Sequence, residues 1–177
     1  DGVSLLSAIN QNTYNINEFM AYILTSVQMQ KQSSAEALNV VFYLDSYRHW
    51  FAKDVYNTDR ESKSRPDFLN VSAKIGDDGK LHLIATVIEC KIAKFANSTE
   101  HITKAITQVE HGLSVLAELF NPTPNDSIRR RYWYAQLYRA LTFSQITFHD
   151  NTEEYLKLAA GLKSILDGDF VIEWNGK

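Results

Sequence analysis

The chain has little of what would indicate several common classes of protein. It contains one cysteine, Cys90, in 177 residues, so no disulfide can form within it, and we expect a reducing, intracellular environment. Three prolines and seven glycines leave little material for a long flexible linker. No run reaches the roughly 18 apolar residues of a membrane-spanning helix. These absences predict a single domain over residues 1–177, in the cytoplasm and without a membrane span.

Other features that the sequence lacks limit the functions that the chain could have. The net charge is −3, so the chain lacks the strongly basic character of many nucleic-acid-binding domains. Clustered carboxylates that hold cations also make a nuclease less basic, so this charge does not exclude one. The spacing of His101, His111 and His149 is not that of a zinc site. No glycine-rich phosphate-binding loop occurs, so any ATPase would lie in another part of the protein or in a partner.

Apolar residues at three- and four-residue spacing predict helices at 15–31, 97–120, 126–141 and 153–166. Residues 142–148 either continue the third of these helices or form a strand. The expected apolar faces of the first two helices are, respectively, Ile16, Phe19, Met20, Ile23, Leu24 and Val27, and Ile102, Ala105, Ile106, Val109, Leu113, Leu116 and Phe120.

Runs of β-branched and aromatic residues predict strands at 39–44, 67–75, 81–92 and 170–174. The second and third of these are joined by a turn containing Asp78-Gly79, a strong β-hairpin signal. Together with the helices, these strands predict an α/β fold with a mixed central β-sheet flanked by helices.

The hairpin predicts that two acidic side chains, distant in sequence, lie opposite each other. A three-residue turn with Gly79 in the left-handed conformation pairs Gly76 with Lys80. This register places Asp67 opposite Glu89, on the same face of the sheet. A two-residue turn would instead place Asp67 opposite the residue after Glu89, on the other face. We predict the three-residue turn.

Two charged residues follow an apolar face of the third predicted strand. Glu89 and Lys91 share that face with Leu83, Ala85 and Val87, which we expect to be buried against a helix. A charged pair at that depth usually has a functional reason. The alternative is an ordinary ion pair on a surface hairpin.

Carboxylates and a lysine in this arrangement suit the hydrolysis of phosphodiesters. A divalent cation can neutralise the phosphodiester, activate a water and stabilise the leaving oxygen. Asp67 and Glu89 supply the hard oxygen ligands that Mg²⁺ prefers, and the backbone carbonyl of Cys90 is a further hard ligand. Lys91 can hold the attacking water or stabilise developing charge.

The sequence resembles the PD-(D/E)XK nuclease superfamily over roughly residues 36–120. The resemblance is carried by Pro66-Asp67, by Glu89-Cys90-Lys91 on the following strand, and by the amphipathic helix from about residue 98. It implies a restriction-endonuclease-like fold in which Asp67 and Glu89 bind Mg²⁺ or Mn²⁺ and Lys91 is catalytic.

Many members of this superfamily also carry a glutamine on the helix after that strand, and Gln108 stands there. By the resemblance, Gln108 is a catalytic residue; otherwise it is an ordinary polar helix residue. The tyrosine that some members have four residues later is replaced by Gly112. An acid on the first helix often completes the site, and the candidates, which stay open, are Asp1, Glu18 and Glu36.

The resemblance also implies a biological setting. The substrate would be DNA, and the chain would be the nuclease module of a larger restriction or antiviral defence protein. An ATPase or helicase module, in the same chain or in a partner, fits a fainter resemblance to large prokaryotic defence proteins.

Two alternatives remain open from the sequence. The first is a catalytically inactive nuclease-fold module that binds DNA or another protein. The second is an unrelated interaction domain whose exposed aromatic residues, such as Trp50 and Trp133, meet a partner. The cluster at residues 129–131, three consecutive arginines, either contacts phosphates or forms a solvated helix face.

Overall fold

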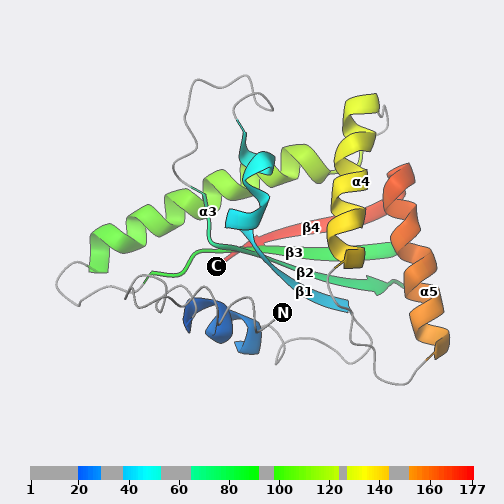
Figure 1. Ribbon diagram of the computed structural model, residues 1–177, viewed down its shortest axis with the longest axis horizontal. Helices are drawn as coiled ribbons and strands as arrows, with labels where there is room; N and C mark the ends of the chain where they lie inside the picture. Colours follow the sequence, from blue (N-terminus) through cyan, green and yellow to red (C-terminus); the bar gives the residue numbers. More distant parts are fainter. Residues whose placement is uncertain (1–19, 29–37, 53–64, 92–97, 124–126, 144–151) are drawn as a thin grey trace.

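A four-stranded mixed sheet forms the centre of the computed structural model (Figure 1). The structure describes residues 20–28, 38–52, 65–91, 98–123, 127–143 and 152–177. The strands are β1 (Leu38–Tyr43), β2 (Phe68–Ile75), β3 (Leu81–Ile88) and β4 (Phe170–Gly176), in that spatial order. β1, β2 and β3 are successively antiparallel, and β4 runs parallel to β3. The predicted mixed α/β architecture is therefore confirmed.

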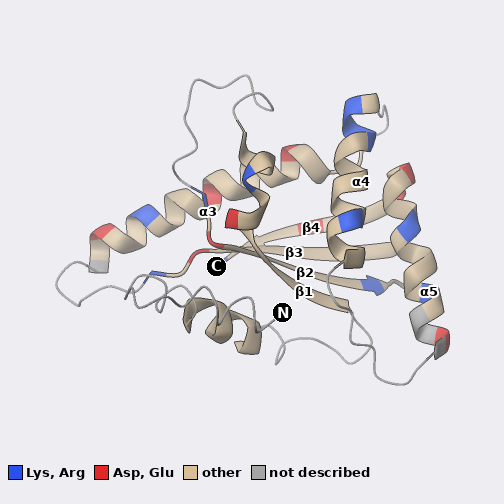
Figure 2. Ribbon diagram, in the orientation of Figure 1, with Lys and Arg blue, Asp and Glu red and all other residues tan. Residues whose placement is uncertain are grey.

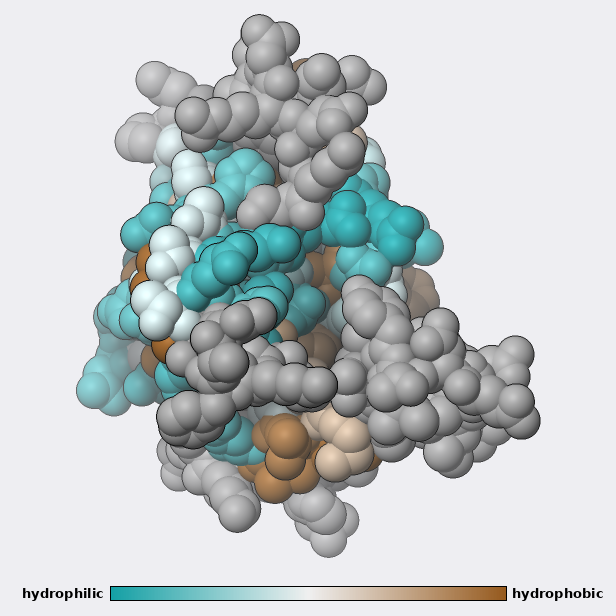
Figure 3. Space-filling view, turned by 90° about the vertical axis from the view of Figure 1, so that its left-hand side faces the viewer, coloured by the Kyte–Doolittle hydropathy of each residue, from teal (hydrophilic) through white to brown (hydrophobic). Residues whose placement is uncertain are grey.

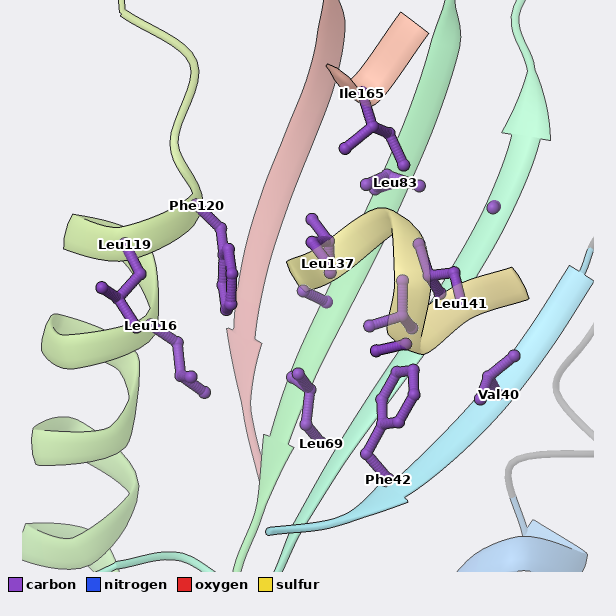
Figure 4. Close-up of a cluster of buried hydrophobic side chains, with 14 of the residues drawn as sticks. Val40, Phe42, Leu69, Leu83, Leu116, Leu119, Phe120, Leu137, Leu141 and Ile165 are labelled. Carbon is purple, nitrogen blue, oxygen red and sulfur yellow. The ribbon is translucent and has the colours of Figure 1, made fainter. Parts of the chain in front are cut away.

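Most of the helices cover one face of this sheet. They are the 3-10 helices η1 (Leu44–Phe51) and η4 (Ser164–Asp167) and the α-helices α3 (Ser98–Phe120), α4 (Ile128–Phe143) and α5 (Thr152–Lys163). Side chains of β1, β2 and β3 on this face pack against these helices to form the main core (Figure 4). The burial predicted for Leu83, Ala85 and Val87 on β3 is confirmed, since they lie in this core and are at most 1% exposed.

A helical segment at residues 20–28 packs on the opposite face of the sheet. There Ala21 and Tyr22 contact a small cluster around Phe68 and Ile88. The prediction that the apolar residues of this helix face the core is wrong. Four of them are described and are 37–62% exposed: Met20, Ile23, Leu24 and Val27. The helix instead turns Ala21, Tyr22 and the buried Thr25 inward.

Helix α3 packs on the sheet through its C-terminal half only. Val109, Leu116 and Phe120 are buried as predicted, but Ile102 and Ile106 are 57% and 53% exposed. The first turns of α3 extend past the ends of the strands, so no part of the sheet lies beneath them (Figure 1). The periodicity predicted the helix correctly but overestimated the length of its buried face.

Several element boundaries differ from the prediction. The strand expected at 81–92 ends at Ile88, and the helix expected at 153–166 ends as the 3-10 turn η4. Residues 142–148 were expected to continue the helix or to form a strand. Helix α4 continues to Phe143, so the first two of these residues are helical, and residues 144–148 lie outside the described ranges. Within the part of the chain that is described, every helix is too short or too polar to cross a bilayer.

Both tryptophans proposed as exposed partner contacts are buried. Trp50 is 0% and Trp133 is 7% exposed, and each packs edge-to-face against Phe120 in the main core. These two aromatic side chains therefore stabilise the fold, and the interaction-domain alternative loses the residues on which it depended.

Candidate active site

The β2–β3 hairpin has the predicted register. The N–H of Gly76 donates to the carbonyl of Lys80 at 2.9 Å, and Gly79 has the left-handed φ of 75°. The ladder then pairs Ile75 with Leu81 and continues to Phe68 opposite Ile88. One step beyond its last pair, Asp67 faces Glu89, as the three-residue turn predicts.

Side chains replace the backbone ladder at this end of the hairpin. The N–H of Asp67 donates to Oε2 of Glu89 at 3.0 Å, and the N–H of Cys90 donates to Oδ2 of Asp67 at 2.9 Å. Each carboxylate thus accepts a hydrogen bond from the backbone of the other strand. The backbone of Glu89 still pairs on its other side, where its N–H donates to the carbonyl of Lys177 at 3.1 Å.

Glu89 also forms an ion pair with Lys91. The Nζ of Lys91 donates to Oε1 of Glu89, whose side chain is 1% exposed, while that of Lys91 is 28% exposed. Burial raises the pKa of Glu89 above its ordinary 4.5, and the negative charge of Asp67 adds to this, against the opposing effect of Lys91. A buried carboxylate with raised pKa beside a second carboxylate is an unfavourable arrangement that a bound cation would relieve.

Cys90 contributes through its backbone. Its thiol contacts the hydroxyl of Thr25, from the helical segment on the opposite face, with 3.4 Å between Sγ and Oγ1. Burial raises the pKa of the Cys90 thiol, so the thiol remains protonated at neutral pH and is a poor metal ligand. The predicted role of Cys90 as a carbonyl ligand does not involve this side chain.

Gln108 on α3 reaches the segment that leads into the site. Its Nε2 donates to the carbonyl of Arg65 at 2.8 Å, two residues before Asp67. Gln108 is 7% exposed, and its Oε1 accepts no hydrogen bond from the described residues. A buried acceptor without a donor is costly, so this oxygen is available to a ligand.

A second ion pair fixes the same segment. The carboxylate of Asp45 on η1 binds Arg65 at 2.7 Å and Arg48 at 2.9 Å. Next to Asp45, the N–H of Leu44 donates to the carbonyl of Asp67 at 2.9 Å. Figure 2 shows acidic and basic positions close together in the region where β2 begins and β3 ends. No local pattern predicts the pairing of Asp45 with Arg65, because they lie 20 positions apart outside regular strands.

Gly112 allows α3 to approach this end of the sheet closely. A Cβ atom at Gly112 would lie 2.5 Å from Cγ and 3.0 Å from Cδ of Pro66, and 3.1 Å from a methyl of Val87. The tyrosine that some superfamily members carry here would not fit. The glycine therefore brings the helix that carries Gln108 against the residue preceding Asp67.

The residues at this site fit a hard divalent cation. Asp67 and Glu89 converge, one of them is buried with a raised pKa, and Gln108 adds an unused buried oxygen. Magnesium commonly takes one or two carboxylates and completes its shell with waters. Within the described ranges no group of three or more His, Cys, Asp or Glu residues could hold a metal ion, so the described residues would supply two carboxylates there. Asp1, Glu18 and Glu36, the candidates for a third acid, lie outside those ranges.

The arginine cluster on α4 has a structural partner. The Nη1 of Arg130 donates to the carbonyls of Glu118 and Asn121, at 3.1 Å and 2.8 Å, at the C-terminal end of α3. These bonds satisfy carbonyls that have no partner within the helix. Arg130 therefore stabilises the end of α3 and is not part of the site at Asp67 and Glu89.

The surface around the site is mainly polar. Figure 3 views the end of the molecule that carries the site and shows hydrophilic residues at its middle height. An apolar group lies below them, on the side of residues 20–28, where Met20 and Leu24 are 45% and 62% exposed.

Comparisons with known proteins identify no relative. No model of a known protein family matches the chain, no curated protein matches it significantly in sequence, and no solved structure matches it significantly in fold.

Proposed function

We propose that this chain is a Mg²⁺- or Mn²⁺-dependent nuclease that hydrolyses DNA phosphodiester bonds. The observation that carries the proposal is the convergence of Asp67 and Glu89, with Lys91 on the buried carboxylate. An arrangement that is unfavourable on its own becomes favourable around a cation and an anionic phosphodiester. The resemblance to the PD-(D/E)XK superfamily, with its mixed sheet flanked by helices, supports the same reading.

Each residue has a role that follows from its contacts. Asp67 and Glu89 would hold the cation, together with the Cys90 carbonyl, and a cation bound there neutralises the phosphodiester and activates water. Lys91, the more exposed member of the pair, would orient the water or the phosphate. Gln108 offers its unused Oε1 to a water. The water oxygen bonds to phosphorus, the opposite P–O bond breaks, and the departing oxygen takes a proton.

The surrounding ion pairs support this geometry. Asp45 holds Arg65, and Gln108 holds the carbonyl of the same residue, so the strand entering the site is fixed from two sides. Rigid positioning of the reacting groups accounts for a large part of enzymatic rate enhancement. The nuclease would act in the cytoplasm, as part of a restriction or defence protein whose ATPase or helicase module lies elsewhere.

Nicking of supercoiled plasmid with Mn²⁺ or Mg²⁺ tests the proposal. Wild-type protein should nick the plasmid, and EDTA should stop the reaction. Asp67→Asn and Lys91→Ala should each lose more than about 100-fold in rate, because they remove a ligand and a proton-transfer or charge-stabilising group.

The matched control is Lys80→Ala at the opposite end of the hairpin. Lys80 forms an exposed ion pair with Asp169 and should be dispensable for activity. Folded wild-type protein that binds DNA but never nicks it, with either metal, would favour the inactive DNA-binding module instead. Nicking that survives both Asp67→Asn and Lys91→Ala would assign the activity to other residues or to a contaminant.

A further inference from the structure

The contact between Lys91 and Glu89 has a consequence for cation binding. Both oxygens of the Glu89 carboxylate already accept a hydrogen bond, Oε2 from the N–H of Asp67 and Oε1 from the ammonium group of Lys91. The side chain of Glu89 is 1% exposed, so water contributes little to stabilising its charge. In the metal-free protein, Lys91 is the cation that compensates the buried carboxylate.

A divalent cation at Asp67 and Glu89 would meet this ammonium group at short range. Two positive groups on one partly buried carboxylate repel strongly, because the local dielectric screens them less than water does. Removing the ammonium group without replacing it would leave the buried carboxylate uncompensated, which is also costly. The favourable states are therefore those with either Lys91 or the metal ion on Glu89, but not both.

We propose that Lys91 and the divalent cation compete for Glu89, so that Lys91 holds the carboxylate in the metal-free protein and is released when metal is loaded. This inference rests on the proposed function and concerns the regulation of the same site. The exchange has two results. It keeps the site assembled in the absence of metal, and it frees the ammonium group for the water or the phosphate only when the cation is present.

The contact pattern supports exchange over simple coexistence. The Lys91 side chain is 28% exposed, so it has solvent into which it can turn. Glu89 is fixed by the backbone of Asp67 and cannot follow it. The more exposed partner of the pair is thus the lysine, and the buried partner is the ligand.

Mn²⁺ binding to the whole chain, measured by calorimetry or by the electron paramagnetic resonance of free Mn²⁺, tests this without DNA and without turnover. Lys91→Met removes the competing charge and should raise the affinity for Mn²⁺ by about tenfold or more, which corresponds to at least 1.4 kcal/mol. Lys91→Gln keeps a hydrogen-bond donor without the charge and should show the same rise. Lys91→Arg keeps the charge and should stay near wild type.

Two further variants separate the possible outcomes. Lys80→Met, which removes an exposed lysine from the other end of the hairpin, should not change the affinity. Asp67→Asn should abolish binding at this site. If Asp67→Asn abolishes binding while both neutral Lys91 variants bind Mn²⁺ as tightly as wild type or more weakly, competition is wrong and the proposed site stands.

Binding that does not depend on Asp67 would mean that the cation is held elsewhere, and it would overturn the proposed site together with the competition. The thermal unfolding of each variant shows that it is folded. Lys91→Gln keeps the test valid if Lys91→Met, which leaves Oε1 of Glu89 without a donor, does not fold.

Discussion

The two ends of the β2–β3 hairpin carry the same kind of ion pair in different surroundings. At the turn, Lys80 binds Asp169 at 2.7 Å, and the two side chains are 52% and 64% exposed. At the other end, Lys91 binds Glu89, whose side chain is 1% exposed. Exposed pairs contribute little to stability and need no further explanation. A buried pair beside a second carboxylate costs stability, and its presence points to a function.

The backbone at the two ends differs in the same way. The turn is closed by ordinary backbone hydrogen bonds and a glycine in the left-handed conformation. At the site end, beyond the last ladder pair, the N–H of Asp67 donates to the Glu89 carboxylate and the N–H of Cys90 donates to the Asp67 carboxylate. The comparison teaches that residue type alone does not distinguish a candidate site from a surface pair. The burial of the carboxylate and the hydrogen-bond partners of each of its oxygens distinguish the two.

The largest effect expected in this comparison comes from a methyl group added at each end of the sheet. In Gly112→Ala, the new Cβ would meet the rigid ring of Pro66 at 2.5 Å, so the chain entering the site at Asp67 must move. In Gly161→Ala on α5, the Cβ would meet only the terminal methyl of Ile75, at 2.4 Å, which can rotate away. We expect Gly112→Ala to lose about 10- to 100-fold in plasmid nicking, because small misplacements of reacting groups are costly.

Gly161→Ala is the matched control. It should keep wild-type nicking and a thermal unfolding midpoint near or above that of wild type, because alanine favours a helix more than glycine does. Equal activity of the two variants would show that the close approach of α3 to Pro66 does not position the site.

A smaller effect concerns the stability of the buried carboxylate. The pKa of Glu89 is raised above 4.5 in the folded protein, chiefly by burial. The folded state therefore holds the proton more tightly than the unfolded state. The contribution of this protonated carboxyl to the free energy of unfolding is fully present below the ordinary pKa. It is lost as the pH rises through the pKa of the folded state. Glu89→Gln removes this loss, so the variant should unfold a few degrees higher than wild type at pH 8, and at nearly the same temperature at pH 4.

Thermal unfolding in EDTA, followed by circular dichroism, measures this difference. The comparison variant is Asp169→Asn at the exposed pair, which should change the midpoint by less than about 1 °C at either pH. If Glu89→Gln is less stable than wild type at pH 8, the ion pair with Lys91 outweighs the cost of burial. The Glu89 carboxylate would then be a stabilising group, without the strain that motivates a cation site.

The sequence was sufficient for the parts of the fold that depend on local pattern. The Asp-Gly turn and the alternation of β2 determined the register, and the register determined that Asp67 faces Glu89. Periodicity also predicted α3. It could not show that Ile102 and Ile106 remain exposed, because that depends on where the sheet ends beneath the helix.

The supporting contacts of the site depended on tertiary packing. Asp45 and Arg65 meet only because η1 folds back beside the start of β2. The reason for glycine at position 112 is the ring of Pro66, which the sequence places 46 positions earlier. The inward side of residues 20–28 was also misjudged, because a short helix on a sheet can bury small and polar residues such as Ala21 and Thr25.

The most direct test of the central claim is a crystal of the protein soaked in Mn²⁺ and measured at a wavelength where manganese scatters anomalously. We expect an anomalous peak between the carboxylates of Asp67 and Glu89, with the ammonium group of Lys91 moved off Oε1 of Glu89. A peak elsewhere, or Asp67 and Glu89 turned away from each other with no peak between them, would contradict it.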